Sequence, residues 1–164
     1  MAESKALLAE LKRESANSRT MIQRLNAESY NWKPHEKSYT LLALAQHIAN
    51  LPVWVQYIVN QDDYDVTSPV HDAKGISTVP ALVEFFDKRI EEAEAILNST
   101  TDEHLSLPWT FRRGEHIVAT MPKKIAIRYI VLNHIVHHRG QLSVYLRLLN
   151  IPVPGMYGPS ADEK

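Results

Sequence analysis

The sequence predicts an all-α fold, a four-helix bundle with crossover topology. Apolar residues recur at helical spacing in four long stretches, and no stretch shows a convincing alternation of apolar and polar residues. Two long connections and one shorter connection separate these stretches, which is typical of a bundle with crossovers. The chain has 164 residues and only five glycines, so we expect one domain over residues 1–164.

The first two helices are predicted over residues 4–26 and 39–61. The first carries an apolar stripe between charged residues, whereas the second is apolar nearly all round, which is typical of a buried helix. Pro52 lies inside the second helix and has no backbone N–H. We therefore expect a kink there, with the loss of one hydrogen bond to the carbonyl of Ile48.

The third and fourth helices are predicted over residues 79–98 and 122–149. Ser77 or Thr78 is the expected N-cap of the third helix, and Pro80 fits its first turn. The segment 101–120 between the two helices is expected to be an irregular crossover, with a short hairpin as the alternative. After Asn150 the chain is too rich in proline to continue as a helix.

Composition excludes several classes of function. The net charge is −1, and the only clustered basic residues are too few to form a nucleic-acid-binding face. Cysteine is absent, so disulfides, thiolate ligands and a sulfur nucleophile are excluded, and any thiol would have to arrive on a substrate or cofactor. We see no signal peptide and no apolar run of membrane-spanning length. A cytoplasmic protein without membrane or nucleic-acid partners is expected.

The predicted fourth helix carries three histidines within five residues. His134 and His138 are one turn apart, and a helical wheel places both on an apolar face together with Tyr145. His137 falls at the edge of that face. Gln141 lies close enough to orient a ligand or a bound water, although a hydrogen-bonded core glutamine is an equal alternative. Arg139 is expected to face outward or toward a partner subunit.

A third histidine on another helix completes a candidate metal site. The wheel of the second helix places His47 among large apolar side chains, so it too is expected to face the interior. A buried histidine bonded to a carbonyl is the alternative for each of the three. No carboxylate shares these faces, and three histidine ligands leave a position open, as in catalytic sites. The remaining histidines lie in predicted connectors, where solvent is the expected partner: His35, His71, His104 and His116.

At these residues the sequence resembles the DinB family of small helical metal-binding proteins. The resemblance is carried by His134-x-x-x-His138-Arg139-Gly140-Gln141-Leu142, followed by Tyr145-Leu146-Arg147 and the tail 151–163. A second part runs from Trp32-Lys33-Pro34 to Leu44-Ala45-Gln46-His47-Ile48. Together the matching segments cover nearly a third of the chain.

The resemblance implies a bundle of up-down-down-up order that often forms homodimers. It also implies that His47, His134 and His138 coordinate a divalent metal, with zinc or nickel as the first choices. Related proteins in the wider superfamily act with low-molecular-weight thiols such as bacillithiol, mycothiol or glutathione. The donor set alone leaves the metal open, because three histidines also accept cobalt or copper.

Two functions follow from this site. The first is a metal-dependent hydrolase or thiol S-transferase for a small molecule, in which a metal-bound water or thiol reacts and Tyr145 or Gln141 is a weaker candidate for substrate contact. Trp109 and Tyr157 are expected to line the entrance. The second is a non-catalytic metal-binding module for stress response or interaction. A fourth coordination position that solvent can reach would favour the enzyme.

Overall fold

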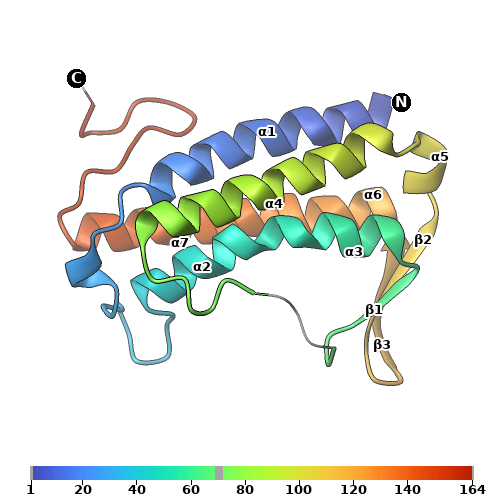
Figure 1. Ribbon diagram of the computed structural model, residues 1–164, viewed down its shortest axis with the longest axis horizontal. Coiled ribbons are helices and arrows are strands. Elements are labelled where there is room, and N and C mark those ends of the chain that lie inside the picture. The colour runs from blue at the N-terminus through green and yellow to red at the C-terminus, as the bar shows by residue number, and fades with distance from the viewer. Residues whose placement is uncertain (1, 69–71, 164) are drawn as a thin grey trace.

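The computed structural model describes residues 2–68 and 72–163, and it shows four long helical segments that pack side by side (Figure 1). Two segments are single helices, and the other two are built from consecutive shorter helices. The segments are α1 (Ala2–Ile22); α2 (Leu41–Asn50), η2 (Leu51–Val53) and α3 (Trp54–Asn60); α4 (Val79–Ser99); and α6 (Lys123–Ala126), η3 (Ile127–Leu132) and α7 (Asn133–Leu148). The prediction of a mainly helical fold is confirmed.

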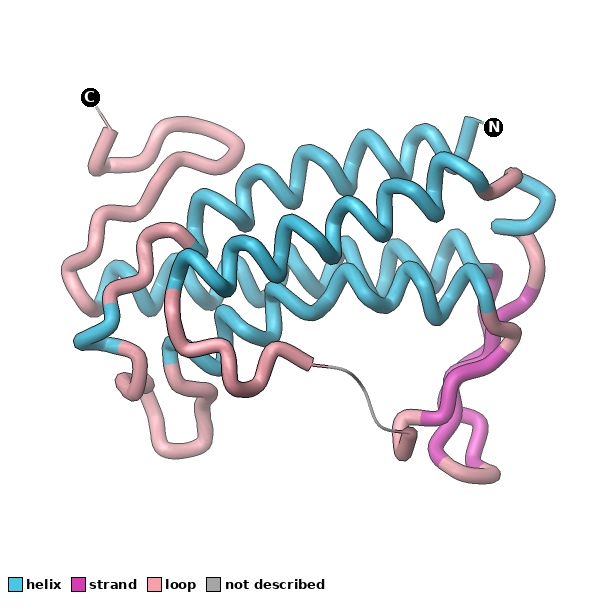
Figure 2. Tube along the Cα trace, in the orientation of Figure 1, coloured by secondary structure: helices cyan, strands magenta, loops and turns pink. Residues whose placement is uncertain are grey.

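The prediction of a strictly all-α fold is wrong, because a small sheet lies at one end of the bundle (Figure 2). Its strands are β1 (Asp63–Asp65), β2 (Pro108–Arg113) and β3 (His116–Pro122), with β1 parallel to β2 and β2 antiparallel to β3. The hairpin alternative for the crossover is therefore correct, and β1 was not foreseen. A bulge between Phe111 and Arg112 shifts the pairing register, which breaks the alternation that marks a strand in a sequence.

The second helical segment changes geometry at Pro52, as the sequence predicts. A short 3₁₀ turn, η2, separates α2 from α3. The carbonyl of Ile48 accepts a hydrogen bond from the N–H of Leu51, three residues on, because Pro52 has no N–H to offer it. Buried residues continue from α2 through η2 into α3.

Threonine caps begin the helices that follow loops. The hydroxyl of Thr40 accepts from the N–H of Ala43 at 3.2 Å, and Thr78 does the same for Ala81 at 3.4 Å. Of the two caps considered for the third helix, Thr78 is the one used. Two further short helices lie in the connections, η1 (Ala27–Ser29) and α5 (Asp102–Leu105).

A buried lysine joins the sheet end of the bundle to α3. Lys123 is fully buried, and its ammonium donates hydrogen bonds to the carbonyls of Ile58 at 2.9 Å, Val59 at 3.3 Å and Gln61. These carbonyls belong to the last turn of α3 and the residue that follows it, where no N–H of the helix can reach them. Lys123 therefore caps α3 and fixes where the last helical segment begins.

None of the described helices is long and apolar enough to span a membrane. The hydrophobic core instead runs along the axis of the bundle and includes residues of all four segments.

Arg139 does not face outward, contrary to the prediction. Only 3% of its surface is exposed, and its guanidinium donates to the backbone carbonyl of Glu14 at 2.9 Å and to the Glu14 carboxylate. The hydroxyl of Ser18 and that of Tyr157 in the C-terminal tail accept further hydrogen bonds from it. The wheel failed because it was centred on the histidines, whereas the buried arc of α7 extends to the side that faces α1.

Candidate metal centre

Three histidines from two helical segments converge inside the bundle. His47 lies on α2, and His134 and His138 lie one turn apart on α7. The Nε2 atoms of His47 and His134 are 3.4 Å apart, and one ring nitrogen from each of the three histidines lies within 4.8 Å of the others. Two nitrogens that share one zinc ion are about 3.4 Å apart in a tetrahedral site. The three residues that the sequence proposed as ligands are therefore brought together, and the group could hold one metal ion.

The surroundings keep these three imidazoles neutral. Burial, followed by the proximity of His138 and His134, lowers the pKa of His47 to about 4. Burial is also the main cause that lowers the pKa of His134 and of His138. A metal binds the unprotonated imidazole nitrogen, so at neutral pH all three lone pairs are available.

Hydrogen bonds outside the group orient the rings. The Nδ1 of His138 lies 2.7 Å from Oε1 of Gln141, so Nδ1 carries the proton and donates it to this oxygen. The Nε2 of His138 is then the atom left to bind a metal. A hydrogen bond with the backbone of Ile130 likewise engages His134. Partners of this kind fix the tautomer and the direction of a metal-binding histidine.

The other described histidines stay outside the group. His137 is exposed, with its ring 4.8 Å from that of His138, and it does not belong to the cluster of ligand atoms. The sequence predicted solvent as the partner of His104. Instead, its Nε2 lies 2.7 Å from the carbonyl oxygen of Val59. His71 lies outside the described residues.

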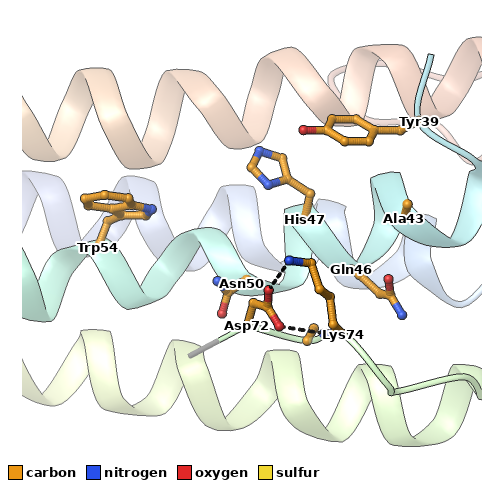
Figure 3. Close-up of a pocket in the computed structure, with 9 residues that line it drawn as sticks. Tyr39, Ala43, Gln46, His47, Asn50, Trp54, Asp72 and Lys74 are labelled. Atoms are coloured by element: carbon orange, nitrogen blue, oxygen red, sulfur yellow. Dashed lines mark hydrogen bonds and ion pairs between the residues drawn. The ribbon is translucent and has the colours of Figure 1, made fainter. Parts of the chain in front are cut away.

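Two cavities meet at His47. The first, of about 350 Å³, has polar side chains on its floor, including Gln46 and Asn50 of α2. Figure 3 shows the ring of Tyr39 and the imidazole of His47 on one side of it and the Asp72–Lys74 ion pair opposite. The second cavity, of about 460 Å³, shares His47 and Trp54 with the first and is also lined by His134. His47 is thus reachable from both cavities, and His134 is reachable from the second.

Two predictions about the entrance do not hold in this geometry. Trp109 is completely buried, so it does not line the entrance. Tyr157 lines neither cavity and instead binds Arg139 and Glu14. The hydroxyl of Tyr145 donates to the backbone carbonyl of Tyr39 at 3.3 Å, as expected of a core tyrosine, which is the alternative to substrate contact that the sequence favoured for it.

Sequence reasoning missed several residues that line the cavities. Asn50 follows His47 by three residues, so helical spacing could have placed it on the same face. Phe111 comes from the unexpected hairpin. Tyr129 comes from η3, a π-helical turn whose wider winding shifts the facing of the residues before His134 relative to an ideal wheel.

The metal-free protein is expected to lose stability as the pH falls from about 6.5 toward about 4. In this range the unfolded His47 binds a proton while the folded one, with its pKa near 4, does not, so protonation favours the unfolded chain. Urea unfolding with a chelator present, at pH 7 and pH 5, measures the loss. His47→Asn should reduce the difference between the two pH values, and an unchanged difference would contradict the assignment.

Known proteins match this chain in sequence. The model of the DinB family matches residues 1–164. The chain is 26% identical over 148 residues to the uncharacterized protein YrdA of Bacillus subtilis (strain 168), over 87% of this chain and 81% of that protein.

Solved structures share the fold. A DinB-like protein from Bacillus subtilis superposes with a TM-score of 0.72 at 16% identity, covering 97% of this chain and 99% of the other. One from Bacillus cereus ATCC 10987 gives 0.73 at 23% identity, over 93% and 97%. The mycothiol-dependent maleylpyruvate isomerase gives 0.55 at 8% identity, over 92% of this chain but 62% of that one. With a family model that matches its whole length and neighbours of the same fold, the chain belongs to the DinB family.

Proposed function

We propose that this protein is a divalent-metal-dependent enzyme that acts on a small molecule, either as a low-molecular-weight-thiol S-transferase or as a hydrolase. The observation that carries the proposal is the convergence of three neutral imidazoles where two cavities meet. Within the described residues, the group contains no fourth histidine or carboxylate. A position for a substrate atom is therefore left, as in catalytic rather than structural sites.

The three imidazoles of the group fit a divalent metal ion that prefers nitrogen ligands. His47, His134 and His138 would hold it, with zinc or nickel as the proposed metal. A bound ion would act as a Lewis acid that lowers the pKa of a water or thiol beside it. The protein's own groups would keep the ligands neutral by burial and hold His138 through Gln141.

Two observations support the thiol branch of the proposal. The chain has no cysteine, so thiol chemistry would need a thiol from a second molecule, and two cavities that both border His47 leave room for a thiol and a second substrate. The isomerase that shares the fold depends on mycothiol. Its likeness concerns the fold alone. We further propose that the protein acts in the cytoplasm and forms a homodimer, which sedimentation of the metal-loaded protein would test.

The test compares thiol conjugation with hydrolysis on zinc-loaded and nickel-loaded protein. Bacillithiol, mycothiol and glutathione are each offered with 1-chloro-2,4-dinitrobenzene, and p-nitrophenyl acetate is offered without a thiol. Turnover should fall at least about 100-fold in His47→Ala, because losing one ligand removes the metal at working concentrations. His104→Gln serves as the control, since His104 lies outside the group.

Each outcome assigns the function. Thiol-dependent turnover supports the transferase, and thiol-independent turnover supports the hydrolase. A wild-type protein that binds the metal but turns over none of these substrates, and loses stability or changes oligomeric state without it, would favour a non-catalytic metal-binding module instead.

A further inference from the structure

The cavity on the His134 side has an aromatic wall. Trp54 of α3, Phe111 of β2 and Tyr129 of η3 line it together with His47 and His134. These three aromatic residues come from three separate parts of the chain. Only the folded protein brings them to the metal group.

The wall is held in place from behind. The ring of Phe111 lies 6.0 Å from that of Trp54 and 5.9 Å from the buried ring of Trp109, measured between centroids. Trp54 in turn packs edge-on against Tyr64, which is buried, at 4.7 Å. Because these contacts already restrict Trp54 and Phe111, the two side chains lose little conformational entropy when a ligand binds. The surface is therefore preorganised for an apolar group.

The front of the cavity is open. Tyr129 is 67% exposed, and Phe111 is only partly covered. An exposed aromatic patch beside a cluster of functional side chains is typical of a ligand site rather than of a structural surface.

The other cavity has a different character. It shares Trp54 with the cavity on the His134 side and has Tyr39 on its wall, but Gln46, Asn50 and Lys74 line it as well, and the Oδ1 of Asn50 is buried without a hydrogen-bond partner among the described residues. A buried acceptor of this kind needs a donor, which a polar ligand would supply. The cavity with Phe111 and Tyr129 therefore offers the larger aromatic surface, and the cavity with Asn50 offers more polar partners.

We infer that the cavity of Trp54, Phe111 and Tyr129 binds the apolar, aromatic-sized end of the substrate, with its reacting atom directed at the metal group. This inference rests on the proposed function and adds the class of substrate. It also gives the β2–β3 hairpin a role in substrate binding, because Phe111 of β2 lines the cavity.

Two hydroxamates that differ only in their apolar end test the inference. Acetohydroxamate and benzohydroxamate carry the same metal-binding group, so the ratio of their dissociation constants measures what the ring adds. On zinc-loaded wild-type protein, benzohydroxamate should bind about 10- to 50-fold more tightly, since it buries a phenyl ring in the cavity. The dissociation constants are measured by calorimetry on protein of verified zinc content.

The variants locate the effect. Tyr129→Ala removes an exposed ring that the fold does not need, and Phe111→Ala removes the wall itself. Each should lower the ratio several-fold, and the pair together should bring it near one. Tyr39→Ala is the matched control, because Tyr39 lies beside His47 but lines the other cavity. It should keep the ratio.

Equal affinities for the two hydroxamates on zinc-loaded wild-type protein would overturn the inference and leave the proposed function standing. The same result is expected if a second copy of the chain fills the cavity. A ratio that Tyr39→Ala lowers as much as Tyr129→Ala would also overturn it, by placing the ring in the polar cavity. A wild-type protein that takes up no divalent metal would overturn both proposals.

Discussion

Arg139→Met is expected to lower the free energy of unfolding by about 3–5 kcal/mol, the cost of removing one partner from a buried ion pair. The guanidinium of Arg139 satisfies both the carboxylate and the backbone carbonyl of Glu14, and Glu14 is itself 7% exposed. Methionine fills a similar volume, so the loss comes from the charge left behind rather than from a cavity. Urea unfolding of the metal-free protein, followed by circular dichroism, measures it.

Two further variants separate this pair from an ordinary surface contact. The double variant Arg139→Met with Glu14→Gln should recover much of the loss, because no unpaired charge remains. Arg147→Met breaks the exposed pair between Arg147 and Asp162, which also ties α7 to the tail, and should cost less than about 1 kcal/mol. If Arg139→Met cost no more than Arg147→Met, the buried network would not stabilise the fold.

The helices and the histidine group are predictable because burial repeats with the helix. Apolar spacing set the four segments to within a few residues, and Pro52 marked the break in the second one. The position of His134 and His138 one turn apart on α7 follows from their spacing alone. Helical periodicity alone was therefore enough to predict the four helical segments and the three histidines of the group.

The facing of the last helix was harder to predict. Ile135, Leu142 and Leu146 are fully buried, so the centre of the buried arc lies between His138 and Arg139. The two metal-facing histidines lie toward one edge of that arc. This edge position suits a site, because both rings are partly desolvated by the bundle while His134 also lines a cavity.

Contacts between distant residues account for what the sequence did not predict. β1 pairs with β2 across nearly fifty residues, and three residues of alternating sequence are too short a signal to reveal a strand. Tyr157 reaches Glu14 from the far end of the chain. Neither contact leaves a periodic pattern, so only the folded backbone shows that Phe111 lines the site and Tyr157 does not.

The second large effect concerns metal affinity. His138→Ala should weaken zinc binding about 100- to 1,000-fold, since structural zinc sites gain about 10–16 kcal/mol from four ligands and this change removes one. Gln141→Leu keeps all three ligands but removes the hydrogen bond to Nδ1 of His138. It should weaken binding about 10- to 100-fold, because the ring is then free to change tautomer and direction. Competition against a chelating indicator at pH 7 gives both values.

His137→Ala is the control for this order of effects, since it removes an adjacent imidazole that the group does not use. Its zinc affinity should stay within about threefold of the wild type, because a surface substitution away from the ligands changes little. We therefore expect zinc affinity to be lowest in His138→Ala, intermediate in Gln141→Leu and nearly unchanged in His137→Ala. A His137→Ala protein as weak as His138→Ala would mean that His137 is itself a ligand. The assignment of the ion to His47, His134 and His138 would then be wrong.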